Sequence, residues 1–217
     1  MKLAQVKQGM NHVLQLLAPI MQVNNIEYTA NSLSWRGRTR GIYKEVYYPI
    51  EYQGLIDLRQ YSILLTDGSF LQIYYDFDNQ GLTAARLAYY PAPVSTKSTK
   101  EDIFDAADIA IERNEDELYE HLYNCIELLE GKSLYPVNTS HIRFDYDKNV
   151  TAHEPSHIQL GAIQELRVPA NFFPQPLAFI ELIGPLIGNL GIFKDEHVQH
   201  ARSNSLVLSK LNKLTEV

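Results

Sequence analysis

Residues 69–90 read SFLQIYYDFDNQGLTAARLAYY, two β-rich runs separated by a short polar turn. In the first run apolar side chains alternate with polar ones, at Leu71, Ile73 and Tyr75, which is the period of a half-buried strand. The intervening DNQG contains a glycine, which tolerates the positive φ of a tight turn. The stretch therefore predicts a β-hairpin with one apolar and one polar face.

Similar short runs lie on both sides of this hairpin. IYKEVYY and YSILL precede it, within residues 42–65, and HIRFDYD, SHIQLG and ELRVPA follow it, within residues 141–170. TDGS, at residues 66–69, is a second turn sequence. Consecutive short strands joined by glycine-containing turns predict an antiparallel meander.

Apolar side chains recur every three or four residues in other parts of the chain. Residues 3–22, 103–112 and 114–129 carry such stripes, and LAFIELI at residues 177–183 is a short apolar helix. Leu17 and Phe179 lie on these stripes and are expected to be buried, and one more helix is expected over residues 196–213.

These elements predict an α+β fold, with a single antiparallel β-sheet (a meander) and helices packed on one face. The chain, residues 1–217, is expected to be one domain with a helical insertion at about residues 101–132 between sheet segments. No internal repeat is visible.

Composition narrows the classes of function. The formal net charge of −7 disfavours a general nucleic-acid coat protein, because phosphate binding needs clustered Lys and Arg, and leaves only a local basic patch as a route. The single cysteine, Cys125, excludes an internal disulfide and is interpreted as a small core residue. Neither a secretion signal nor a membrane span is recognisable, so we expect a cytoplasmic protein.

The polar face of the predicted sheet is rich in groups that bind and react. Strand alternation gathers on it Tyr74, Asp76, Arg86, Tyr90, His141, Arg143, Asp145, His157 and Gln159. A register that sets residue 145 opposite 157 would place Asp145 where it can orient the His157 imidazole. Such a set can position phosphate, transfer protons or hold a divalent metal. A solvated outer face of a one-sided sheet produces the same alternation, and this alternative stays open.

The residues of this face receive separate predicted roles. Arg143, Asp145 and His157 are the predicted catalytic unit, with the loop residue His153 and with Tyr90 as assistants. Substrate binding is assigned to four further residues: Arg86, Asp76, Tyr74 and Gln159. No metal site is predicted, since the three-residue spacing of His197 and His200 is weak evidence for a metal, and the sequence leaves the cofactor unknown.

A basic motif lies outside this set. WRGRTRG, at residues 35–41, concentrates three arginines between small neighbours. Its guanidinium groups can face phosphates or an acidic partner, or lie in a solvated strand or turn.

Several motifs together resemble a bacterial family catalogued as domain of unknown function twenty-two-ninety. The resemblance rests on TDGSFLQIYYDF, LAYYPAP, HIRFDYD, HEPSHIQLG and RVPANFFPQPLAFIELI, and it covers most of the chain. The matching positions are Asp67, Gly68, Ser69, Tyr89, Tyr90, Pro91, Arg143, Asp145, His153, Pro155 and His157. ELRVP departs from the Cys-Arg-Ile-Pro form of the family, so any role of that cysteine is absent here.

A shorter likeness extends to TumE-like toxins of bacterial toxin–antitoxin pairs. It comprises the Asp-Gly-Ser turn, the Arg-X-Asp strand and the histidine group that follows. This likeness implies a toxin or defence effector that acts on nucleic acid or nucleotides and is held by a partner protein. Its chemistry would be phosphodiester or nucleotidyl transfer, with Arg143 and Arg86 on phosphate and His157 as acid/base. The alternative is a non-catalytic subunit of a bacterial defence complex, whose sheet face docks a protein partner.

Overall fold

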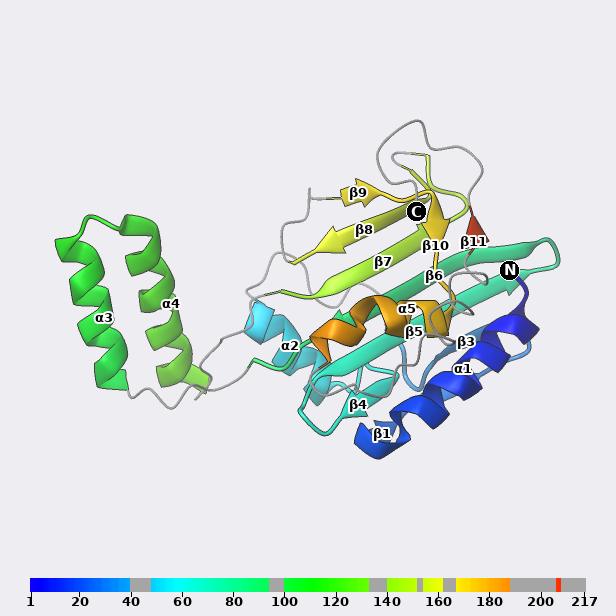
Figure 1. The fold of residues 1–217 in the computed structure, drawn as a ribbon, viewed down its shortest axis with the longest axis horizontal. Helices are drawn as coiled ribbons and strands as arrows, with labels where there is room; N and C mark the ends of the chain where they lie inside the picture. Colours follow the sequence, from blue (N-terminus) through cyan, green and yellow to red (C-terminus); the bar gives the residue numbers. More distant parts are fainter. Residues whose placement is uncertain are drawn as a thin grey trace. The chain divides into compact units, whose positions relative to one another are not determined.

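The computed structural model describes residues 1–39, 48–93, 100–132, 140–151, 154–161, 167–187 and 206–207. The chain divides into two compact units. The first unit, residues 1–91 with 140–217, contains the sheet, and the second, residues 92–139, contains two helices (Figure 1). That these units form one domain with an insertion stays a prediction.

The first unit is built on an antiparallel sheet of nine described strands, in the order β1-β4-β5-β6-β7-β8-β9, with β3 beside β5 and β2 beside β3. Their bounds are β1 Met21–Asn24, β2 Ile26–Tyr28, β3 Ser32–Trp35, β4 Ile63–Leu65, β5 Phe70–Asp78, β6 Gly81–Tyr90, β7 Ile142–Asp147, β8 Ser156–Leu160 and β9 Arg167–Pro169. The α+β class and the antiparallel meander are therefore confirmed.

Two helices cover the apolar face of this sheet, α1 (Leu3–Leu17) and α5 (Pro176–Ile183). The expected burial of Leu17 and Phe179 is confirmed, since both side chains are fully inaccessible. The helix expected over residues 3–22 ends at Leu17, because Pro19 introduces the 3-10 turn η1 (Ala18–Ile20) and the chain continues as β1.

A third helix, α2 (Tyr48–Asp57), lies at one end of the opposite face. The ring of its residue Tyr48 stacks on that of Tyr90, with 6.3 Å between the ring centroids, and the rings of Tyr52 and Phe70 are 5.3 Å apart between centroids. The β-rich region expected over residues 42–90 therefore contains a helix, and its first part, residues 42–47, lies outside the described residues. Pro49 at the start of α2 favours a helix N-terminus, which explains the difference.

The C-terminal part of the first unit is described only in short pieces. Strand β10 (Phe172–Phe173) pairs with β11 (Leu206–Val207) in a separate two-stranded sheet. The helix expected over residues 196–213 is thus wrong at residues 206–207, and its other residues lie outside the described part. η2 (Gly184–Leu186) follows α5 at Pro185.

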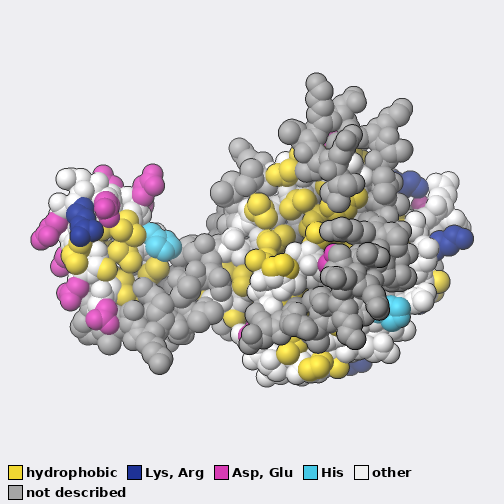
Figure 2. All heavy atoms as spheres, in the orientation of Figure 1, with side chains coloured by type: hydrophobic (Ala, Val, Ile, Leu, Met, Phe, Trp, Pro, Cys, Tyr) yellow, Lys and Arg dark blue, Asp and Glu magenta, His cyan; other side chains and the backbone are white. Residues whose placement is uncertain are grey.

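The second unit contains α3 (Lys100–Glu112) and α4 (Asp116–Lys132), which match the two helices predicted there. Ile103, Ala107 and Ile126 are buried within it, as is Cys125, whose predicted place in a core is confirmed. Acidic side chains surround its apolar ones in Figure 2. Residues 92–139 hold 11 acidic and 4 basic residues, a net charge of −7, whereas the first unit holds 15 of each. The whole net charge therefore belongs to the helical unit.

Candidate functional site

The sheet register aligns the polar side chains in rows across the strands. Tyr74 on β5 is opposite Arg86 on β6, Arg86 is opposite Asp145 on β7, and Asp145 is opposite His157 on β8. The predicted pairing of residues 145 and 157 is therefore confirmed. A second row joins Gln72, Ala88, Arg143, Gln159 and Arg167.

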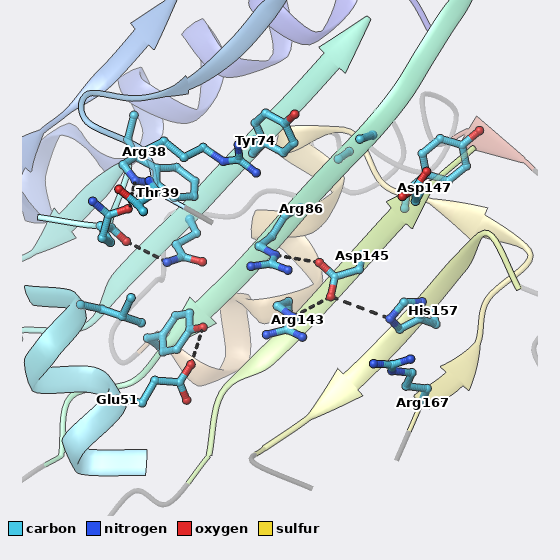
Figure 3. A pocket seen from close by; sticks show the side chains of 18 of the residues that line it. Arg38, Thr39, Glu51, Tyr74, Arg86, Arg143, Asp145, Asp147, His157 and Arg167 are labelled. Atoms are coloured by element: carbon cyan, nitrogen blue, oxygen red, sulfur yellow. Dashed lines mark hydrogen bonds and ion pairs between the residues drawn. The ribbon is translucent and has the colours of Figure 1, made fainter. Parts of the chain in front are cut away.

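Asp145 is the centre of the charged cluster (Figure 3). The Nε atoms of Arg86 and Arg143 donate hydrogen bonds to its two carboxylate oxygens, each at 2.7 Å. Arg143 also donates to Gln159 Oε1. His157 Nε2 lies 3.8 Å from Asp145 Oδ2, the oxygen that also accepts the hydrogen bond from Arg143. One carboxylate thus fixes two guanidinium groups and faces one imidazole.

Electrostatics keep this carboxylate ionised. Burial by itself raises the pKa of Asp145, but the positive charges of Arg86 and Arg143 outweigh it and hold the pKa below its usual value. Conversely, Asp145 raises the pKa of Arg143 against the opposing effect of burial. Asp145 is therefore suited to orient its partners and not to donate a proton.

The cluster lies in a pocket of about 370 Å³. The charged side chains that line it are Arg38, Arg86, Arg143, Arg167, Glu51, Asp145 and Asp147. Gln72, Tyr74 and His157 also line the pocket and are no more than 7% exposed. The polar face is therefore largely buried at these positions, unlike the solvated sheet face that alternation alone also allows.

One end of the pocket is closed by Glu51 from α2. Its Oε1 accepts a hydrogen bond from the Tyr90 hydroxyl at 3.2 Å, and its Oε2 lies 3.6 Å from His141 Nδ1. Burial raises the pKa of Glu51, although Tyr90 and the arginines oppose it. Burial, reinforced by Arg143 and Arg86, lowers the pKa of His141 to about 3, so this imidazole is neutral at pH 7.

The structure brings most of the predicted site residues together. Those that line the pocket are Tyr74, Arg86, Tyr90, Arg143, Asp145 and His157. Gln159 binds Arg143 from beside the pocket. Asp76 lies farther along β5, opposite Ala84 and Ser32, and does not line the pocket, whereas His153 lies outside the described residues.

Glu51 and Arg167 are among the lining residues that the sequence did not lead us to predict. Tyr48, Tyr52 and Leu55, which flank Pro49 and follow it, recur at helical spacing, and this signal would have placed Glu51 on a helix. Arg167 on β9 is opposite Gln159 on β8, so its side chain points to the same polar face of the sheet. Applying the alternation rule to β9 would therefore have added Arg167 to the predicted site.

Residues 18–185 match the model of a family described as uncharacterized conserved protein (DUF2290). The chain belongs to the DUF2290 family. In this DUF2290 protein the match runs from η1 to η2 and includes every residue that lines the pocket. No curated protein and no solved structure matches the chain at a significant level, and the comparisons give no support to the likeness to TumE-like toxins. No helix in the described part of the chain has the length and apolar character needed to cross a bilayer.

Proposed function

We propose that the pocket binds a phosphate-bearing ligand, a nucleotide or a segment of nucleic acid, and catalyses phosphodiester or nucleotidyl chemistry on it. The observation that carries this proposal is that the Asp145 carboxylate accepts hydrogen bonds from two arginines. Each guanidinium is held through its Nε atom, which fixes its plane. Arg86 keeps its two terminal nitrogens as a fork of donors, whereas one terminal nitrogen of Arg143 is bound to Gln159. Planar forks of this kind match the oxygen atoms of a phosphate.

The donor capacity of Arg86 supports an anionic ligand. Among the described residues, its terminal nitrogens donate no hydrogen bond, and the side chain is 36% exposed at the pocket. Arg143 and the exposed Arg167 lie in the neighbouring row. Four arginines oppose three carboxylates in the lining, within a unit of zero net charge. The local field therefore favours an anion.

His157 is the group we assign to proton transfer. Its imidazole is buried, lines the pocket and faces the ionised Asp145, which can orient the ring. The 3.8 Å separation is longer than a hydrogen bond, and catalytic contacts commonly shorten when substrate binds. Arg143 acts with this pair by fixing the carboxylate oxygen that His157 faces.

The biological role proposed for this chemistry is that of a toxin or defence effector held by a protein partner. The alternative, a non-catalytic docking subunit, would be served by a flat and open ion-paired face. The concave polar lining supports ligand binding over docking. Bacterial growth and phage resistance, compared between wild type and His157→Ala, test the role separately from the chemistry.

Calorimetric titration with pyrophosphate tests the binding step. We expect wild type to bind, Arg86→Ala and Arg143→Ala to weaken binding at least about tenfold, and Arg113→Ala to leave it unchanged. Arg113 is an exposed arginine at the end of α3 that does not line the pocket, so it controls for the loss of one charge. Absence of pyrophosphate binding, or an equal loss in the Arg113 variant, would overturn the proposal.

The chemical step needs its own measurement. Wild type and His157→Ala are incubated with single-stranded RNA, single-stranded DNA and nucleoside triphosphates, and the products are separated. We expect conversion of at least one substrate by wild type and its loss in the variant, with pyrophosphate binding retained. A variant that binds and converts as wild type does would remove His157 from the mechanism.

A further inference from the structure

The end of the pocket opposite His157 is built from the basic motif that the proposed chemistry does not use. Arg38, Thr39 and Tyr74 line this end (Figure 3), and Trp35, beside Arg38, also lines the pocket. The guanidinium carbon of Arg38 lies 3.5 Å from the centre of the Tyr74 ring and 5.5 Å from that of Trp35. The arginine is thus held flat on an aromatic ring at the pocket wall.

A buried glutamine fixes the loop that carries Arg38. Gln60 is 4% exposed, and its Oε1 accepts hydrogen bonds from Trp35 Nε1 at 3.2 Å and from the Thr39 backbone N–H at 2.8 Å. Its Nε2 donates to the carbonyl oxygens of Gly37 at 2.8 Å and Leu58 at 3.1 Å. Gly37 has a φ of +69°, a conformation that glycine adopts without strain. The loop is therefore preorganised, unlike a solvated turn.

The same end of the pocket contains an unsatisfied acceptor. Gln72 lines the pocket, is 4% exposed, and donates through Nε2 to the Gln60 carbonyl oxygen at 2.8 Å, which fixes the orientation of its amide. Its buried Oε1 accepts no hydrogen bond from any described residue. A buried oxygen without a donor is costly, and a donor on a bound ligand would remove that cost.

From these contacts we infer that the pocket is a mononucleotide site, in which the base stacks on the Arg38 guanidinium above Tyr74 while the phosphates lie on Arg86 and Arg143. A shift of the Gln72 side chain would let an N–H group on the edge of the base donate to Oε1, which is inaccessible in its present position. Guanidinium planes and aromatic rings are the surfaces on which proteins stack bases. The pocket volume of about 370 Å³ lies within the range that encloses a small organic ligand. The inference rests on the proposed function and adds the base to it.

Titration with pyrophosphate and with ADP, GDP, CDP and UDP tests the base site. We expect at least one nucleoside diphosphate to bind about tenfold more tightly than pyrophosphate. Arg38→Ala and Arg38→Lys should both abolish the preference for the nucleoside diphosphate over pyrophosphate, because the lysine variant keeps the charge but lacks the planar group on which a base stacks. Arg36→Ala, two residues away and exposed, is the matched control and should keep the preference. Thermal melts confirm that each variant is folded.

The outcomes separate this inference from the proposed function. If pyrophosphate binds and no nucleoside diphosphate binds more tightly than pyrophosphate, the base site is overturned while the phosphate site stands. Retention of the full preference in Arg38→Lys would also overturn the stacking arrangement. If neither pyrophosphate nor any nucleotide binds, the proposed function fails and the base site fails with it.

Discussion

The two faces of strands β5 to β8 are both largely buried, yet they are made of opposite kinds of side chain. On one face Ile73, Leu87 and Phe144 pack under α1 and α5. On the other, Gln72 and His157 are equally inaccessible. Burial of the apolar face stabilises the fold by roughly 25 cal/mol per Å², whereas burial of polar groups costs free energy unless they are hydrogen-bonded. The polar face is therefore retained at a cost to stability, as expected of a ligand-binding site.

The largest effect is expected on the apolar face. Phe179 is fully buried and contacts Phe144 edge-on at 6.1 Å, so Phe179→Ala should lower the free energy of unfolding by about 3–5 kcal/mol. Urea denaturation measures this, and pyrophosphate affinity of the folded variant should not change. An unchanged urea midpoint would contradict the assignment of this face as the source of stability.

A smaller but still substantial effect is expected on the polar face. Asp145→Ala leaves Arg143, which is 17% exposed, without its carboxylate, and breaks the contact to Arg86. Removing one partner of a fully buried pair costs roughly 3–5 kcal/mol, and the exposure of Arg86 reduces our expectation to about 2–3 kcal/mol. Ligand binding should be lost as well. A loss of stability below about 1 kcal/mol would show that the cluster behaves as a surface ion pair.

The buried imidazole of His141 predicts a dependence of stability on pH. Its pKa falls from 6.5 to about 3 in the folded state, so its contribution to stability is complete above pH 6.5 and is lost as the pH falls toward 3. The loss should approach about 1 kcal/mol per pH unit near pH 5. The raised pKa of Glu51 acts in the opposite direction, since protonation of that carboxyl favours the folded state.

The variant His141→Phe isolates the contribution of His141, because phenylalanine can pack against the ring of Tyr90 as the imidazole does, at 4.7 Å between centroids. We measure urea midpoints from pH 7 to pH 4.5 and subtract variant from wild type. The wild type should lose more stability than the variant as the pH falls. Parallel curves would show that His141 takes up a proton as readily in the folded protein as in the unfolded one.

The face of each strand residue could be predicted from the sequence, because successive side chains of a strand point alternately to its two faces. Alternation along the strands predicted at residues 141–147 and 156–162, together with the turn between them, was sufficient to set Asp145 opposite His157. Parity does not tell whether the polar face is covered. That depended on α2, whose helical spacing was obscured by neighbouring tyrosines and by the β-rich run before it. Glu51 was therefore missed.

Net charge gave an incomplete picture. The value of −7 disfavoured a general nucleic-acid coat protein and left only a local basic patch, but this charge resides entirely on residues 92–139, outside the unit that contains the pocket. A sum over the chain loses the distribution of charge, and the distribution determines the field in a pocket. The motif WRGRTRG was a better guide, although only the hydrogen bonds of Gln60 distinguish a fixed Arg38 from a solvated one.

The smallest effect is expected where an ion pair of the same sheet is exposed. Lys148 Nζ lies 3.7 Å from Asp78 Oδ2, and the two side chains are 38% and 45% exposed. The pKa of Asp78 is lowered chiefly by the backbone N–H of Gln80, so the turn is held without the lysine. Lys148→Ala should therefore leave the urea midpoint unchanged within error. If Lys148→Ala and Asp145→Ala proved equally destabilising, burial would not be what distinguishes the pocket from the rest of the sheet, and the argument that its polar groups are retained for ligand binding would lose its basis.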